Sequence, residues 1–152
     1  GVLRRYLGCG IDGFIMPDVE SVEDVSHVRK VMADVLPAEA DGLILLALIE
    51  TMKGVENARD IMSAPGTDAI QIGTSDLAVS MGLPRRGDHP QVKDVALKII
   101  GEAKALGKSA GCPVNKYGMP AVLEAGASCV LLFFADVLAA GIAETKREWP
   151  KA

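Results

Sequence analysis

Short apolar runs alternate with amphipathic stretches along this chain, and that alternation restricts its fold more than any other feature of the sequence. Each run has the length of a strand, and the stretches between the runs carry apolar residues at helical spacing. Strands joined through helices lie parallel, with right-handed crossovers. The pattern predicts about five strand–helix units. The expected strands are 13–16, 42–49, 69–72, 109–113 and 128–134, and the expected helices are 21–32, 55–63, 90–106, 119–125 and 136–149.

Apart from Gln71 and Ser128, runs 43–49, 69–72 and 128–134 are apolar, which is typical of strands that are buried on both faces. We therefore expect helices outside these strands and packed side chains inside. Ser21 with Asp24 three residues later predicts a helix cap, and Pro90 suits a first helical turn. Periodicity alone leaves two α/β architectures open, a doubly wound sheet of five strands and part of a (β/α)₈ barrel.

Composition excludes several classes of protein. The 152 residues suit one domain spanning 1–152, and an apolar fraction of 49% is too high for a disordered chain. A net charge of −4 argues against a general nucleic-acid or anionic-membrane binder. No apolar run reaches the ~20 residues of a membrane span, and the first residues do not resemble a secretory signal. Cys9, Cys112 and Cys129 lack metal-site spacing, so we expect free thiols in a reducing, cytoplasmic compartment.

Two carboxylates follow successive apolar runs, Glu50 after the second run and Asp76 shortly after the third. In both candidate architectures, ligands bind where parallel strands end, on the turns that lead into the helices. If the two strands are neighbours, Glu50 and Asp76 converge there, and paired carboxylates suit Mg²⁺ or Mn²⁺. The alternative is that each carboxylate caps the N-terminus of the helix that follows it.

Other polar residues give weaker signals. Glycine and small hydroxyl residues at 73–75 would let a ligand approach backbone N–H groups, which can hold a carboxylate. Each remaining candidate has a plain structural interpretation that we favour: His27 is a surface residue, His89 is a neighbour of a helix start, Arg85 and Arg86 are solvated rather than clamps for an anion, and Lys116 is a loop residue rather than a Schiff-base lysine.

The stretches IETMKGVENA at 49–58 and PGTDAIQIGTSDLA at 65–78 together resemble the HpcH/HpaI aldolase/citrate lyase family. HPQV at 89–92 continues the resemblance, and GFIMP at 13–17 is similar to the family's fourth barrel strand with its closing proline. The resemblance implies a TIM (β/α)₈ barrel, of which this chain would supply about strands 4–8.

The resemblance also implies a function, a class II aldolase that cleaves or forms 4-hydroxy-2-oxo acids through a metal-bound pyruvate enolate. Glu50 and Asp76 match the ligands of the divalent metal, Mg²⁺, Mn²⁺ or Co²⁺. Gly73, Ser75, Asp76 and Pro17 match positions that bind the substrate. The implied partners are a 2-oxo acid and an aldehyde, with no nucleic acid and no membrane. Relatives are commonly oligomers, and the apolar residues of 136–149 suit either a neighbouring subunit or the core of this chain.

Three departures from the family pattern leave other functions open. Leu48 replaces the family's glutamine, and the segment between the first two strands is short. The family's histidine–acid pair and arginine have no counterpart here, so the proton-transfer residues are unassigned. We therefore expect that residues are missing and that the chain alone has little aldolase activity. The alternatives are a citrate lyase beta-like acyl-CoA lyase and a catalytically incomplete protein with a role in assembly.

Overall fold

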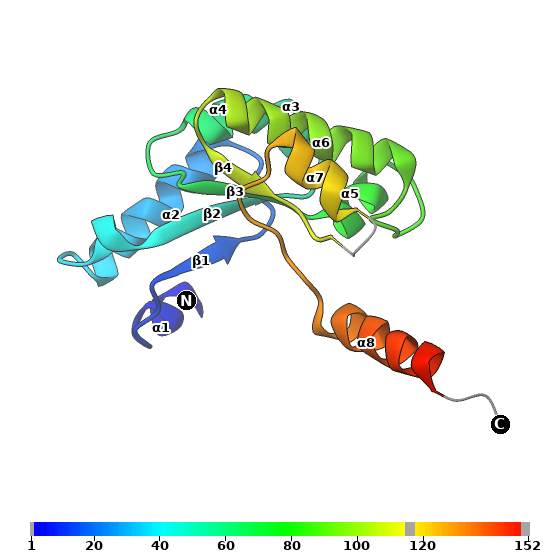
Figure 1. Ribbon diagram of the computed structural model, residues 1–152. Coiled ribbons are helices and arrows are strands. Elements are labelled where there is room, and N and C mark those ends of the chain that lie inside the picture. Colours follow the sequence, from blue (N-terminus) through cyan, green and yellow to red (C-terminus); the bar gives the residue numbers. More distant parts are fainter. Residues whose placement is uncertain (1, 115–117, 150–152) are drawn as a thin grey trace.

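The structure, a computed structural model, describes residues 2–114 and 118–149. Four parallel strands form one sheet in the order β1-β2-β3-β4 (Figure 1). The strands are β1 (Gly13–Met16), β2 (Ile44–Ile49), β3 (Ala69–Ile72) and β4 (Ser109–Gly111). The helices are α1 (Val2–Leu7), α2 (Val22–Val35), the 3₁₀ turn η1 (Ala40–Gly42), α3 (Met52–Glu56), α4 (Ala58–Ser63), α5 (Thr74–Ser80), α6 (Pro90–Ala105), α7 (Met119–Ala125) and α8 (Phe134–Glu148).

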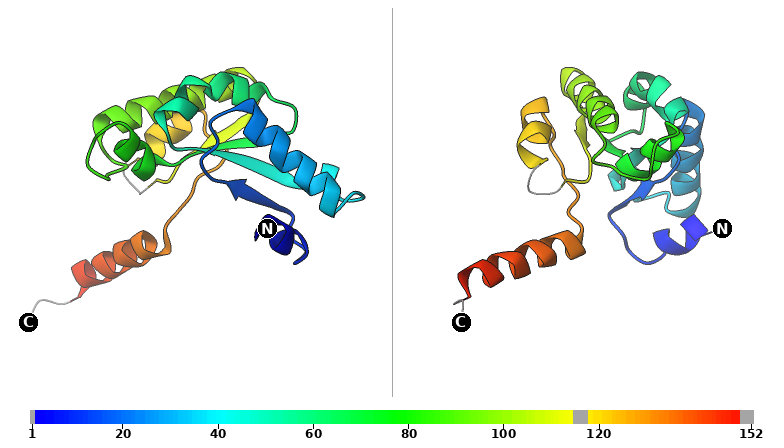
Figure 2. Two further views of the ribbon diagram at one scale, coloured as in Figure 1. Left: turned by 180° about the vertical axis from the view of Figure 1, so that it is seen from behind. Right: turned by 90° about the vertical axis from the view of Figure 1, so that its right-hand side faces the viewer.

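The core lies between the sheet and the helices that cover one of its sides (Figure 2). Side chains alternate between the faces of a strand. In β2, Leu45, Ala47 and Ile49 are buried, whereas Ile44 is half exposed on the opposite face. The covered face packs against helices, and the other face is the inner face of the curved sheet. The four strands thus form an arc of parallel sheet with its helices outside.

Two local predictions are confirmed. Ser21 is the N-cap of α2, where its Oγ accepts from the Asp24 N–H at 3.3 Å and Asp24 Oδ2 accepts from the Glu20 N–H at 3.0 Å. This reciprocal pair satisfies N–H groups that have no partner within the helix. Pro90 occupies the first turn of α6, where its missing N–H leaves no bond unmade.

The single helix expected over 55–63 is instead two short helices. Thr51 is the N-cap of α3 and accepts from the Gly54 N–H at 3.0 Å, which starts the helix earlier than the apolar spacing predicts. Asn57, with φ −96° and ψ 5°, then separates α3 from α4. The apolar spacing continues across Asn57, so periodicity could not locate the break.

The prediction of a strand over 128–134 is wrong. This segment pairs with the end of β4 through one bridge, Pro113 to Leu131, and α8 begins at Phe134. The Leu131 N–H donates to the Cys112 carbonyl at 3.3 Å, and the Val114 N–H donates to the Leu131 carbonyl at 3.0 Å. The pairing extends no further into a ladder, and described residues supply no strand along the segment's other edge. Two of its side chains, Leu132 and Phe133, are about half exposed, at 52% and 50%, rather than covered.

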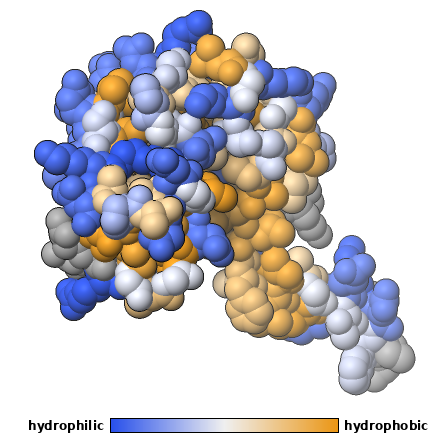
Figure 3. Space-filling view, turned by 90° about the vertical axis from the view of Figure 1, so that its left-hand side faces the viewer, coloured by the Kyte–Doolittle hydropathy of each residue, from blue (hydrophilic) through white to orange (hydrophobic). Residues whose placement is uncertain are grey.

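Helix α8 extends away from the rest of the chain and has no buried residue (Figures 1 and 2). Its apolar side chains therefore do not pack into the core of this chain, one of the two expectations for them. Figure 3 shows hydrophobic side chains gathered where α8 leaves the body. The half-exposed ones are Phe133, Val137, Leu138 and Ile142, and Phe134 is 79% exposed. Within the described residues, no helix has the length and apolar character needed to cross a membrane.

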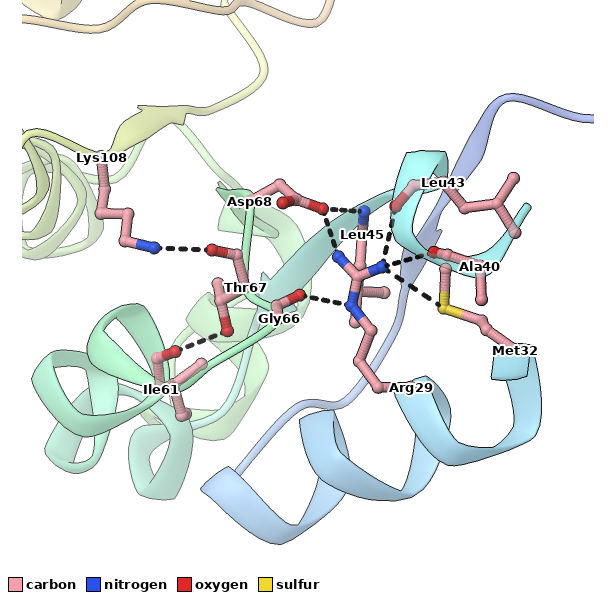
Figure 4. Close-up of polar contacts among 10 residues, drawn as sticks. All are labelled: Arg29, Met32, Ala40, Leu43, Leu45, Ile61, Gly66, Thr67, Asp68 and Lys108. Carbon is pink, nitrogen blue, oxygen red and sulfur yellow. Dashed lines mark hydrogen bonds and ion pairs between the residues drawn. The ribbon is translucent and has the colours of Figure 1, made fainter. Parts of the chain in front are cut away.

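Arg29 of α2 fixes the opposite end of the sheet, where β2 and β3 begin (Figure 4). Its Nε donates to the Gly66 carbonyl at 2.8 Å, and its Nη1 donates to the carbonyls of Leu43 at 2.8 Å and Ala40 at 3.3 Å. Its Nη2 is paired with the Asp68 carboxylate, which also accepts from the Leu45 N–H at 2.7 Å. One side chain thus joins α2, η1, β2 and the turn before β3.

Candidate functional site

Glu50 and Asp76 lie at the same edge of the sheet. Glu50 follows the last residue of β2, and Asp76 lies in the first turn of α5, which follows β3. Ile49 and Ile72 are register partners in parallel strands, so both chains leave the sheet at the same level. Ile49 is buried under the helices, and the alternation of side chains directs Glu50 toward the inner face.

The Glu50 carboxylate is buried, at 9% exposure, and is held in place by backbone. Its Oε1 accepts from the Asp18 N–H at 3.1 Å. A Cβ on Gly73 would lie 2.5 Å from its Oε2, so only glycine leaves room for this carboxylate at the end of β3. The strand-ending glycine noted in the sequence therefore accommodates Glu50.

The surroundings of Glu50 disfavour its negative charge. Burial raises the pKa of the carboxyl above its ordinary value; the Asp18 N–H and Arg85 oppose this rise, and the Asp18 and Asp76 carboxylates add to it. A nearby cation would favour the ionised form. Asp76 is thus close enough to influence Glu50, as expected if the two strands are neighbours.

Neither carboxylate is a helix cap. The N-cap of α3 is Thr51, and the N-cap position of α5 is Gly73, which makes no side-chain bond. Asp76 is instead paired with Arg85 from the loop between α5 and α6. The capping alternative for Glu50 and Asp76 is therefore not observed.

Sequence reasoning missed two members of this site. Asp18 has φ 54°, the only positive φ of a non-glycine residue within the described part of the chain, and this backbone turns its N–H toward Glu50. The signal was the pair Pro17-Asp18 directly after β1, because aspartate tolerates the left-handed region better than most residues. Arg85 was interpreted as solvated, and it is 67% exposed, yet its guanidinium contacts the Asp76 carboxylate.

The predicted substrate-binding positions lie around the two carboxylates. Pro17 is exposed at the end of β1, next to Asp18. The N–H groups of Ser75 and Asp76, in the first turn of α5, have no acceptor in residues 2–114 and 118–149. A cavity of about 490 Å³ adjoins Ser75 and is lined by Thr74, Asp88, Lys93, Val122 and Phe133, among others; neither Glu50 nor Asp76 lines it.

The remaining candidates do not join the site. His27 is exposed on α2, as expected for a surface residue. His89 is the N-cap residue of α6; its side chain makes no capping bond, and its buried Nδ1 has no hydrogen-bond partner among the described residues. Arg86 is paired with Asp88. Lys116 lies outside the described residues. Cys9, Cys112 and Cys129 are free thiols.

The two carboxylates, Glu50 and Asp76, suit a hard divalent ion that takes most of its ligands from water and substrate. Among the residues that the structure describes, no group of three or more His, Cys, Asp and Glu side chains could hold a metal. Two converging carboxylates, one of them buried beside other negative charges, match the few protein ligands that Mg²⁺ usually takes.

The chain has parallel strands with helices outside them, and carboxylates at the carboxyl ends of two neighbouring strands. Together these features define an α/β protein of the TIM-barrel type. The family model for HpcH/HpaI aldolase/citrate lyase matches residues 2–113, and the chain belongs to this family.

Relatives of known structure and name agree with this assignment. A 5-keto-4-deoxy-D-glucarate aldolase of Enterobacter sp. (strain 638) is 30% identical over 132 residues, covering 72% of this chain and 52% of the relative. The chain thus spans about half the length of the curated relatives it matches. A family protein from Burkholderia cenocepacia J2315 superposes with a TM-score of 0.82 at 18% identity, over 96% of this chain and 68% of that one. An HpcH/HpaI aldolase from Desulfitobacterium hafniense DCB-2 gives 0.76 at 23% identity, over 97% and 68%.

Proposed function

We propose that this protein is a divalent-metal-dependent aldolase of the class II pyruvate type, which cleaves or forms 4-hydroxy-2-oxo acids. The observation that carries the proposal is the convergence of Glu50 and Asp76 at the ends of β2 and β3, with neither of them acting as a helix cap. Family membership supports the reaction class, since the relatives include aldolases that are named for a keto acid.

Glu50 and Asp76 would hold the cation, which we expect to be Mg²⁺ or Mn²⁺, with Co²⁺ as a substitute. When bound, the cation supplies Lewis-acid stabilisation of the negative charge that develops on a 2-oxo acid as the carbon–carbon bond breaks.

The residues of the chain prepare this site in three ways. The Asp18 N–H donates to Oε1 of Glu50. This bond orients the carboxylate and leaves Oε2 beside Gly73. The free N–H groups of Ser75 and Asp76 would hold the carboxylate of the 2-oxo acid, with Pro17 beside it. Arg85 is paired with Oδ1 of Asp76, which orients this carboxylate and leaves Oδ2 for a cation. We assign the proton-transfer step to no residue of this chain.

Calorimetric titration with Mg²⁺ and Mn²⁺ tests the metal assignment. The chain should bind the ion, and Glu50→Gln should bind it at least about tenfold more weakly, because a charged ligand becomes a neutral one. Glu56→Gln is the matched control, because Glu56 is exposed on α3 and has no ion pair among the described residues. Equal binding by the parent chain and Glu50→Gln would refute the assignment.

Turnover assays then separate the aldolase from the alternative acyl-CoA lyase. Pyruvate release from a 4-hydroxy-2-oxo acid supports the aldolase, whereas turnover of an acyl-CoA thioester, without turnover of the free acid, supports the lyase. The full-length protein is the sample for this assay, because the chain covers about half of its curated relatives.

We also propose that the protein is a cytoplasmic homo-oligomer. Free thiols at all three cysteines support a reducing compartment. The exposed apolar side chains of α8 support burial against a second copy. Sedimentation velocity should give a species larger than a monomer, and the double variant Val137→Glu/Leu138→Glu should dissociate it. A monomeric parent protein would contradict this proposal.

A further inference from the structure

One buried amide beneath the carboxylates has no hydrogen-bond partner. Gln71, in the middle of β3, is 5% exposed, and its Nε2 has no partner in the described residues. At the other end of the amide, Oε1 accepts a weak hydrogen bond from the Cys129 thiol, whose Sγ lies 3.9 Å away. A buried N–H donor without an acceptor destabilises a fold. The position therefore requires an explanation other than stability.

Gln71 lies on the face of β3 that carries the site. Residues two apart in a strand share a face, so Gln71 points to the same side as Gly73. A Cβ on Gly73 would contact the Glu50 carboxylate, at 2.5 Å from Oε2. Leu48 is the register partner of Gln71, so Gln71 lies one step deeper on the inner face than Glu50.

The neighbours of Gln71 on this face offer no acceptor side chain. Its register partners are Leu48 on β2 and Gly111 on β4, and Ala69 lies one step deeper on β3. Beside Gly111 lies the Cys129 backbone carbonyl, and toward the carboxyl end of β3 the next residue on this face is Gly73, beside which the Glu50 carboxylate lies. There, Oε1 of Glu50 is already bonded to the Asp18 N–H.

We propose that Gln71 is a ligand-binding residue, whose Nε2 donates a hydrogen bond to an oxygen of the 2-oxo acid bound at Glu50 and Asp76. The inference rests on the proposed function and adds a contact from the floor of the site. A keto or carboxylate oxygen only accepts hydrogen bonds, so an amide N–H is a suitable neutral partner that leaves the charge of the carboxylates unchanged.

The test uses two titrations of the same chain, Mg²⁺ alone and then pyruvate at saturating Mg²⁺. Gln71→Met keeps the length of the side chain and removes the N–H donor, and Gln71→Leu is a second variant with the same expectation. Thr67→Val is the matched control, because Thr67 is also buried and donates to the Ile61 carbonyl at 2.7 Å before the other end of β3.

We expect Gln71→Met to bind Mg²⁺ like the parent chain and pyruvate about tenfold more weakly, the effect of losing one hydrogen bond to a charged or polar ligand. Its thermal midpoint should change little, because the bond lost within the described residues is the weak one that Oε1 accepts from the Cys129 thiol at 3.9 Å. Thr67→Val should lower the midpoint and leave pyruvate affinity unchanged.

Three results overturn the inference while leaving the metal assignment intact. They are unchanged pyruvate affinity in the Gln71 variants, loss of affinity only in parallel with a lower thermal midpoint, and a metal-loaded parent chain that binds no pyruvate. A parent chain that binds no Mg²⁺ overturns the proposed function and this inference together.

Discussion

Replacing Arg29 with methionine should destabilise the fold by about 3 kcal/mol. Methionine retains the apolar stem that packs on α2 but removes the guanidinium. Three backbone carbonyls, those of Gly66, Leu43 and Ala40, then lose a charged donor. Hydrogen bonds to charged groups contribute about 1.5–3 kcal/mol each, and partly exposed carbonyls recover part of this from water. We therefore assign about 1 kcal/mol to each carbonyl.

The ion pair with Asp68 adds little to this sum, because the Asp68 side chain is 45% exposed and exposed pairs contribute about 0–1 kcal/mol. Arg29→Lys should recover less than half of the loss, since a single ammonium group cannot reach carbonyls on three sides as the planar guanidinium does.

Urea unfolding followed by circular dichroism measures the loss. With a urea slope of about 2 kcal/mol/M, a loss of about 3 kcal/mol lowers the midpoint by about 1.5 M. Arg59→Met is the control, because Arg59 is exposed on α4 and makes no side-chain bond within the described residues; it should change stability by less than about 0.5 kcal/mol. An Arg29→Met variant as stable as Arg59→Met would refute the reasoning.

Three further predictions concern the site and its supports. Because the folded pKa of Glu50 lies above its ordinary value of 4.5, the native state holds more protons than the unfolded state between the two values, and stability falls as pH rises through that interval. Glu50→Gln, which keeps an acceptor for the Asp18 N–H, should therefore unfold at a higher temperature than the parent chain at pH 7, with the difference vanishing below about pH 4 in a metal-free thermal series. Burial raises the pKa of Asp24, but hydrogen bonds from Glu20 and Ser21 outweigh it and leave the pKa below its ordinary value of 3.8. Asp24→Asn should thus destabilise the fold at pH 7, and urea titrations should show this difference shrinking as pH falls through the folded pKa. Gly73→Ala should weaken Mg²⁺ binding at least about tenfold in calorimetry by displacing Glu50, whereas Gly101→Ala, where a Cβ meets no atom within 4 Å, should leave it unchanged.

The sequence was sufficient for features that depend on regular spacing. Strands 13–16 and 69–72 were predicted with the bounds observed, because each is a short apolar run that ends at a proline or a glycine. The placement of Glu50 and Asp76 at one edge of the sheet followed from the same pattern, since the carboxyl ends of neighbouring parallel strands share an edge.

Features that depend on one backbone angle or on a loop were not predictable in this way. The positive φ of Asp18 and the reach of Arg85 across its loop produce no periodic signal. For the segment 128–134, the sequence predicted a strand where the structure has none. Its apolar residues suggested a buried strand, but burial requires neighbours on both sides, and composition does not indicate whether they are present.

The two ends of the sheet differ in how completely their polar groups are satisfied. At the end where β2 and β3 begin, the Arg29 guanidinium reaches three carbonyls, the Asp68 carboxylate and the Met32 sulfur, and Asp68 is shared between two donors. At the other end, Glu50 is buried beside two further carboxylates, and the Gln71 amide donates to no acceptor within the described residues. Both features are destabilising in the free chain. A bound cation would relieve the first and a ligand oxygen the second, so the proposed metal and 2-oxo acid would together relieve both.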